Sequence, residues 1–122
     1  MKVLIVDDED DIRKIAKIAL SKVGQMDVIE ASSGTEGVRR AAEDRPDVVL
    51  LDVMMPGLDG PSTLAALRSN PATADLPVVF LTAKAMTAEV ERLKGLGARG
   101  VLTKPFDPMK LASELRALVK VP

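Results

Sequence analysis

Five polar side chains stand directly after short apolar runs of the sequence, where they could act together. They are Asp7, Asp8, Asp52, Thr82 and Lys104. Carboxylates a few ångströms apart repel one another unless a positive charge lies among them, and a divalent cation would supply that charge. Magnesium suits the set better than calcium, because it is commonly held by one or two carboxylates, water and a phosphate. Zinc is disfavoured because the 122 residues include no histidine and no cysteine.

A carboxylate beside magnesium, a lysine and a hydroxyl fits phosphoryl transfer better than acid–base chemistry. The transferred group spreads negative charge over its equatorial oxygens, and nearby cations stabilise that charge. A carboxylate nucleophile that forms an acyl phosphate is an established form of covalent catalysis. The residues alone therefore predict magnesium-assisted phosphorylation of a carboxylate, and they leave open which aspartate is the nucleophile.

The polar side chains can meet only if the apolar runs before them are neighbouring strands of one sheet. Five runs indicate strands, and they span residues 3–6, 28–31, 48–51, 77–81 and 100–103. Helix-period segments separate them, so we expect an α/β fold, a doubly wound (βα)5 parallel sheet covered by helices on both faces. In such sheets, sites form at the carboxyl ends of the strands.

The first and last helical segments each carry an apolar stripe that we expect to face the sheet. In the first segment the stripe comprises Ile12, Ile15, Ala16, Ala19 and Val23, at the spacing of one helical face. In the last segment it comprises Leu111, Leu115, Leu118 and Val119. Gly24 stands where the first helix would end.

Composition narrows the classes of function. The chain has 17 basic and 18 acidic residues and no basic run, which argues against a nucleic-acid partner and a polybasic membrane tether. No apolar stretch approaches the ~20 residues of a membrane helix, and no secretory signal is recognisable. The lack of histidine excludes a Ser-His-Asp site and a phosphohistidine in this chain. We expect one cytoplasmic domain over residues 1–122 with no membrane contact.

Four motifs, in their order along the chain, resemble those of receiver domains, which belong to the response regulators of two-component signalling. They are residues 3–9, 50–60, 81–83 and 104–106. The resemblance covers essentially the whole chain, and it implies the flavodoxin-like strand order 2-1-3-4-5. It also implies a bacterial-type signalling phosphoprotein rather than an enzyme.

The resemblance assigns the metal ligands. Asp52 would be the phosphoacceptor and would also bind Mg²⁺. Asp8 would bind Mg²⁺ directly as well, together with the backbone carbonyl of Met54. Asp7 would act on the metal through water.

The resemblance also assigns the residues that handle the phosphate and the readout. Lys104 would pair with Asp52 and then with the phosphoryl oxygens, and Thr82 would hydrogen-bond the phosphate. The Lys104-Pro105 bond is expected to be cis. Receivers usually carry Tyr or Phe three residues before the lysine, where this chain has Val101. The signal is therefore expected to run through the loop at residues 83–88 and its helix rather than through an aromatic switch.

The partners that the resemblance implies are those of a signalling module. A sensor histidine kinase or a histidine phosphotransfer protein would donate the phosphoryl group. A downstream target or output domain would read the change, because phosphorylation adds roughly −1.5 to −2 of charge. A homodimer through the last two helices and the fifth strand is a further expectation.

Simpler interpretations exist for single residues. Asp7, Asp8 and Asp10 could serve only as helix N-caps, and Thr82 could be another cap. Residues 57–60 need only be turn chemistry, with glycine supplying a positive φ.

Two other functions are weighed against the signalling module. A receiver-like interaction domain that is never phosphorylated is one, although the intact set of acids, hydroxyl and lysine argues against it. An aspartyl-phosphate phosphatase of the haloacid-dehalogenase type is the other. Such enzymes carry an Asp-x-Asp motif, whereas Met54 stands two residues after Asp52.

Overall fold

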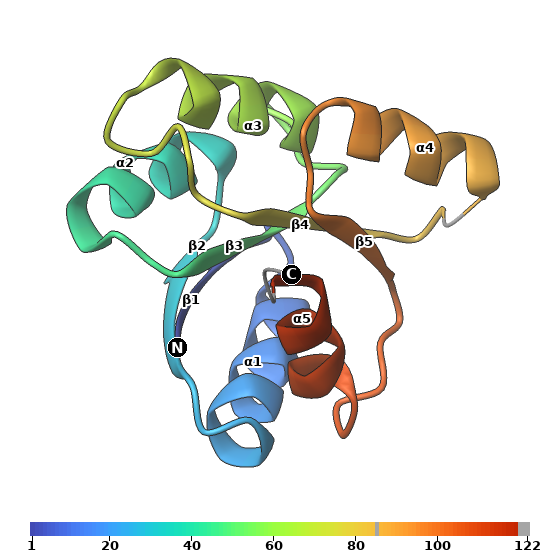
Figure 1. Ribbon diagram of the computed structural model, residues 1–122. Coiled ribbons are helices and arrows are strands. Elements are labelled where there is room, and N and C mark those ends of the chain that lie inside the picture. Colours follow the sequence, from blue (N-terminus) through green and yellow to red (C-terminus); the bar gives the residue numbers. More distant parts are fainter. Residues whose placement is uncertain (85, 120–122) are drawn as a thin grey trace.

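Five parallel strands form one sheet in the order β2-β1-β3-β4-β5, so the expected strand order is confirmed. The structure, a computed structural model, describes residues 1–84 and 86–119 (Figure 1). The strands are β1 (Lys2–Val6), β2 (Asp27–Ala31), β3 (Val48–Asp52), β4 (Val78–Thr82) and β5 (Gly100–Thr103). Residue 85, in the loop expected to carry the signal, lies outside the described residues.

Helices cover both faces of the sheet, which confirms the doubly wound α/β class. They are α1 (Asp10–Ile18) with its continuation η1 (Ala19–Val23), α2 (Gly34–Asp44), α3 (Gly60–Ser69), α4 (Thr87–Gly95) and α5 (Leu111–Val119). Helices α1 and α5 lie on one face, and α2, α3 and α4 lie on the other (Figure 1). In the part of the chain that the structure describes, no helix is long and apolar enough to cross a membrane.

The sheet separates two apolar cores, and the side chains of each strand point alternately into one core and the other. In β1, Val3 and Ile5 join the core beneath α1 and α5, whereas Leu4 and Val6 join the core beneath α2, α3 and α4. Successive side chains of a strand point to opposite faces, so a strand buried on both faces must be apolar throughout. This is why β3 and β4, which are buried along their whole length, read as unbroken apolar runs up to their last residue.

The buried face of the first helix differs from the expected one. Ala16 and Ala19 are buried as expected, but Ile15 and Val23 are each 44% exposed, and Leu20 is fully buried in their place. The spacing from Ile12 fits Ile15 and Ala16 equally well, so periodicity alone could not choose between them. The chain also widens into a π-helical turn, η1, where Gly24 N–H donates to the carbonyl of Ala19. In the last helix the expected face is confirmed, because its four apolar residues all contact the core.

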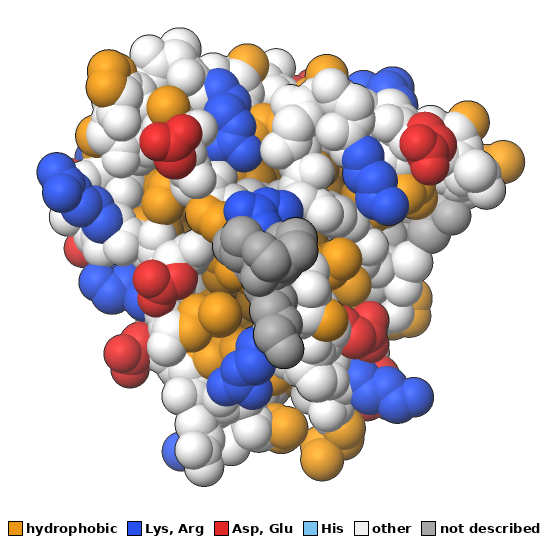
Figure 2. Space-filling model, in the orientation of Figure 1, with side chains coloured by type: hydrophobic (Ala, Val, Ile, Leu, Met, Phe, Trp, Pro, Cys, Tyr) orange, Lys and Arg blue, Asp and Glu red, His pale blue; other side chains and the backbone are white. Residues whose placement is uncertain are grey.

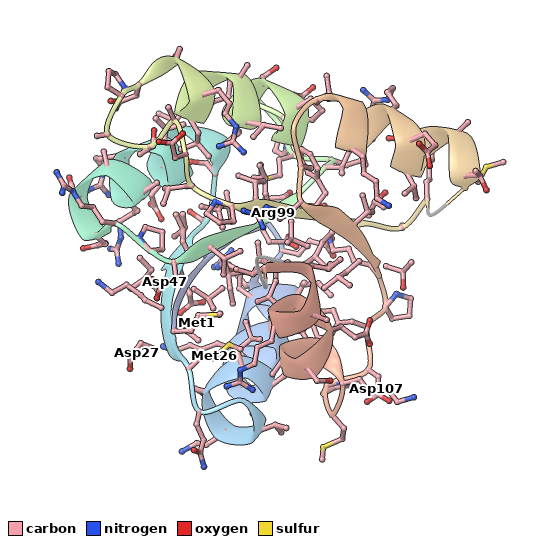
Figure 3. The ribbon with its side chains drawn as sticks, in the orientation of Figure 1. Met1, Met26, Asp27, Asp47, Arg99 and Asp107 are labelled. Carbon is pink, nitrogen blue, oxygen red and sulfur yellow. The ribbon has the colours of Figure 1, made fainter. Side chains whose placement is uncertain are left out.

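The two ends of the sheet differ in character. Asp27 begins β2 and Asp47 precedes β3, so these labelled side chains mark the amino end of the sheet (Figure 3). Figure 2 shows the same side of the molecule, where acidic and basic side chains are interspersed rather than gathered. The polar residues singled out from the sequence lie at the opposite, carboxyl end.

Candidate functional site

Three carboxylates meet at the carboxyl end of the sheet. Asp7 and Asp8 follow β1, and Asp52 is the last residue of the neighbouring strand β3. One carboxylate oxygen from each lies within 4.8 Å of the others. Asp7 and Asp52 are buried, whereas Asp8 is exposed. The parallel sheet thus brings together the three acids that the sequence singled out.

Lys104 places a positive charge among these acids. It follows β5, and its Nζ lies 3.0 Å from Asp7 Oδ2 and 3.3 Å from Asp52 Oδ1. The same Nζ donates a hydrogen bond to Glu9 Oε1 at 3.0 Å. Glu9 was not singled out from the sequence as a site residue. Its only signal there was its place directly after Asp7 and Asp8, since the contact joins residues 95 positions apart.

Burial and like charge both act on Asp52. Burial of the carboxylate and, after it, the charge of Asp7 raise the pKa of Asp52 from 3.8 to about 6, although Lys104 opposes the rise. Burial lowers the pKa of the Lys104 amine, but its contacts with Asp7 and Glu9 outweigh this and hold that pKa above its ordinary value. Lys104 is therefore a permanent cation at the site and not a base.

Asp7 supplies a direct test of whether the site fits a metal. Its Oδ1 accepts a hydrogen bond from the backbone N–H of Glu9 at 2.9 Å. Its Oδ2 is buried, faces Lys104 as an ion pair, and has no hydrogen-bond partner among the described residues. Buried polar atoms without partners are rare and call for an explanation such as a bound ion or water. The donors that converge here are carboxylate oxygens, which suit Mg²⁺.

The N-cap interpretation of the acids is wrong. The N-cap of α1 is Glu9, and its side chain makes no capping bond. Thr82 is not a helix cap either, since α4 is capped at Met86. The Thr82 side chain is buried at the end of β4, and its Oγ1 accepts a hydrogen bond from Lys84 N–H at 3.0 Å. The hydroxyl of Thr82 therefore keeps its own proton available as a donor.

An open hollow of about 350 Å³ gives access to Asp52. Glu9 and Lys104 line it, together with the apolar Ile12 and Met54. The backbone N–H of Met54 lies 3.4 Å from Asp52 Oδ1, and the Met54 side chain is 71% exposed. Neither Asp7 nor Asp8 lines this hollow. Of the three acids, Asp52 is the one that a ligand in the hollow would meet.

Val101 of β5 and Phe106, which follows this strand, pack against opposite faces of the sheet. Val101 is partly buried and packs against the core beneath α2, α3 and α4. Phe106 is partly buried against the other core. The Lys104-Pro105 bond is cis, as expected.

Residues 57–60, which lead into α3, were expected to serve only as a turn, and the structure confirms this for Gly57 and Asp59 but not for Gly60. Gly57 has the expected positive φ of 75°, and Asp59 caps α3 by accepting a hydrogen bond from Ser62 N–H at 2.8 Å. Gly60 has no positive φ; it is required by a close approach. A Cβ at this position would lie 2.5 Å from the carbonyl oxygen of Asp52 and 2.7 Å from Val53 Cα.

Gly60→Ala is therefore expected to displace the end of β3 and to destabilise the fold by about 1–2 kcal/mol, the usual size of an overpacking effect. The added methyl meets backbone on both sides and cannot be relieved by a rotamer change. Urea unfolding would measure the loss, with Gly95→Ala as the control, because a Cβ at Gly95 meets nothing within 4 Å. Equal stability of the two variants would contradict the close-approach interpretation.

Comparison of the whole chain with known proteins points to one family. The sequence model of the response regulator receiver domain matches residues 3–116. Protein PilG of Pseudomonas aeruginosa is 35% identical over 98% of this chain and 87% of its own length. The alkaline phosphatase synthesis transcriptional regulatory protein PhoP of Bacillus subtilis is 37% identical over 98% of this chain.

The fold comparison agrees with the sequence comparison. The chemotaxis response regulator CheY4 of Vibrio cholerae has a TM-score of 0.88 and 33% identity, over 96% of this chain and 97% of that one. Several curated relatives are longer, and this chain spans only 48% of PhoP and 45% of the probable transcriptional regulator ycf27 of Guillardia theta.

Proposed function

We propose that this chain, because it belongs to the response regulator receiver domain family of two-component signalling, accepts a phosphoryl group on Asp52. One observation carries the choice of Asp52: of the three clustered acids it alone lines the open hollow, and it does so with Lys104 Nζ 3.3 Å from its Oδ1. A nucleophile must be reachable by its donor, and the charge that develops on the transferred group must meet a fixed cation.

The donor is proposed to be a phosphohistidine of a sensor histidine kinase or of a histidine phosphotransfer protein. An oxygen of Asp52 forms the new bond to phosphorus as the P–N bond breaks. The imidazole keeps the electron pair of that bond and takes up a proton. Lys104 stays protonated throughout and stabilises the phosphoryl oxygens by charge, while Thr82 donates its hydroxyl proton to one of them.

The carboxylate cluster is proposed to hold Mg²⁺. Asp8, Asp52 and the backbone carbonyl of Met54 would be direct ligands, and Asp7 would act through water. The partnerless buried Oδ2 of Asp7 supports this, because an ordered water or ion would satisfy it. Bound Mg²⁺ would offset the repulsion among the carboxylates and stabilise charge on the transferred group.

The rest of the proposal concerns the module as a whole. Residues 1–122 are proposed to form a single cytoplasmic signalling domain, not a turnover enzyme, that contacts neither membrane nor nucleic acid. Phosphorylation would alter the surface around residues 83–88, and a downstream target or output domain would bind the altered surface. No aromatic switch is proposed, because Val101 stands where receivers usually carry Tyr or Phe. Self-association through α4, β5 and α5 is also proposed.

The test is covalent modification by a small donor. With Mg²⁺ and acetyl phosphate or phosphoramidate, we expect intact mass spectrometry to show one adduct of about 80 Da, the mass of a phosphoryl group bound as an acyl phosphate. Asp52→Asn should remove the adduct, whereas Asp11→Asn, which changes an exposed acid of α1, should keep it. A wild-type chain without any adduct, or an adduct that survives Asp52→Asn, would refute the proposal.

A further inference from the structure

Glu9 is a fourth carboxylate at the site, and its contact is with the lysine. Its backbone is fixed by local structure, because its N–H donates to Asp7 Oδ1 and its carbonyl accepts from Arg13 N–H at 3.1 Å. Its side chain then reaches across the hollow to Lys104, with Oε1 3.0 Å from Nζ. Glu9 is thus held in place by the start of α1 while it restrains a residue from the far side of the site.

Carboxylates surround the ammonium group of Lys104 in this arrangement. An ammonium group carries three N–H donors and no acceptor. Its Nζ faces three carboxylates, at 3.0 Å for Asp7, 3.0 Å for Glu9 and 3.3 Å for Asp52. A phosphoryl oxygen that approaches Lys104 must therefore compete with these carboxylates, and Glu9 is the one that accepts a hydrogen bond from its Nζ.

The three carboxylates differ in the free energy that each would lose if its contact with Lys104 were broken. Asp7 is fully buried, and its Oδ2 has no hydrogen-bond partner among the described residues that could replace Lys104. Asp52 is buried too, and it carries the phosphoryl group. The Glu9 side chain is 59% exposed, so water can take the place of the lysine there. An exposed ion pair is weak, whereas a buried charge that loses its partner is costly.

We infer that Glu9 is a positioning residue, which holds Lys104 in the unphosphorylated protein and yields it to the phosphoryl group. This inference rests on the proposed function of Asp52. Glu9 competes with the incoming anion for Lys104, and its own negative charge lines the hollow that the anion enters. Its removal frees one donor of the ammonium group and lessens the repulsion of the donor molecule.

The kinetic test compares two changes at Glu9. Glu9→Gln removes the charge, and Glu9→Asp keeps the charge but is one methylene shorter, so it cannot span the contact to Lys104. With acetyl phosphate at saturating Mg²⁺, both variants are expected to be phosphorylated about two to five times faster than wild type, the size of a partly exposed ion pair. The matched control is Asp11→Asn, an exposed acid two residues along with no contact to Lys104. Its rate should equal that of wild type.

A second measurement needs no phosphoryl transfer and so separates this inference from the proposed function. In ¹⁵N NMR without donor, the Lys104 ammonium protons should exchange with water more rapidly in Glu9→Gln and Glu9→Asp than in wild type or Asp11→Asn. Absence of any adduct in wild type would refute phosphorylation of Asp52, and unchanged ammonium exchange would refute the hold on Lys104. Equal acceleration by Asp11→Asn, or a rate in both Glu9 variants no higher than in wild type, would also overturn the inference.

Discussion

Lys104→Met is expected to slow phosphorylation of Asp52 by acetyl phosphate about a hundredfold, the low end of what one preorganised donor supplies to a developing anion. Methionine keeps the length of the side chain and removes its charge. Lys104 is only 11% exposed and lies against Asp52 and Asp7, so its charge is little screened by water. The rate of adduct formation at saturating Mg²⁺, followed by intact mass, measures the effect. Lys14→Met, on the exposed side of α1, is the matched control and should react as wild type does.

The loss in Lys104→Met has two parts that pH separates. Lys104 lowers the pKa of Asp52, so its removal raises that pKa further and leaves less of the carboxylate ionised. That part should be recovered as pH is raised from 6 to 9, because the carboxylate then ionises fully. The part due to the missing cation should persist at every pH. A variant that regains the wild-type rate at high pH would show that Lys104 tunes Asp52 and does not contact the phosphoryl group.

The strand ends explain why so much of the site could be predicted. Asp52 and Thr82 end wholly buried apolar strands, so their positions in the sheet follow from where each apolar run stops. Parallel strands end at a common edge, and this brings Asp7 and Asp8 to the same place. The residues could not rank the three acids, however, because rank depends on which one lines the hollow. The resemblance to receiver domains singled out Asp52, and the three-dimensional packing adds that Asp52 alone of the three lines the hollow.

Two kinds of feature could not be predicted from the sequence. They are contacts between side chains far apart in the chain and close approaches of the backbone. The Glu9 contact with Lys104 depends on rotamers that two separate loops impose, and no periodicity encodes it. Gly60 looks like an ordinary turn glycine until the carbonyl of Asp52 is placed beside it. The spacing of apolar residues in α1 and η1 fits two helical faces equally well. The face that carries the small Ala16 and Ala19 packs into the core, and Ile15 is left exposed.

Asp52→Asn is expected to stabilise the metal-free protein at neutral pH, even though it removes the proposed phosphoacceptor. The pKa of Asp52 is about 6 in the folded protein against an ordinary value of 3.8. Between about pH 4 and pH 6 the folded state therefore binds more protons than the unfolded state, and the free energy of unfolding of the wild type falls as pH rises. Above pH 6 the ionised Asp52 exerts its full destabilising effect, up to about 3 kcal/mol at 1.36 kcal/mol per pKa unit.

Asparagine has nearly the same shape and no charge, so the variant avoids this effect at every pH. In EDTA, urea unfolding should show the variant to be more stable by about 2–3 kcal/mol at pH 7.5, with a difference that shrinks toward pH 4. Mg²⁺ should narrow the gap at pH 7.5, because it stabilises the carboxylate form only. Asp11→Asn, which removes an exposed charge, should show no such pH dependence. If the difference in unfolding free energy between the variant and wild type stays constant from pH 4 to pH 8, the prediction fails. Such a result would mean that burial and the charge of Asp7 do not raise the pKa of Asp52.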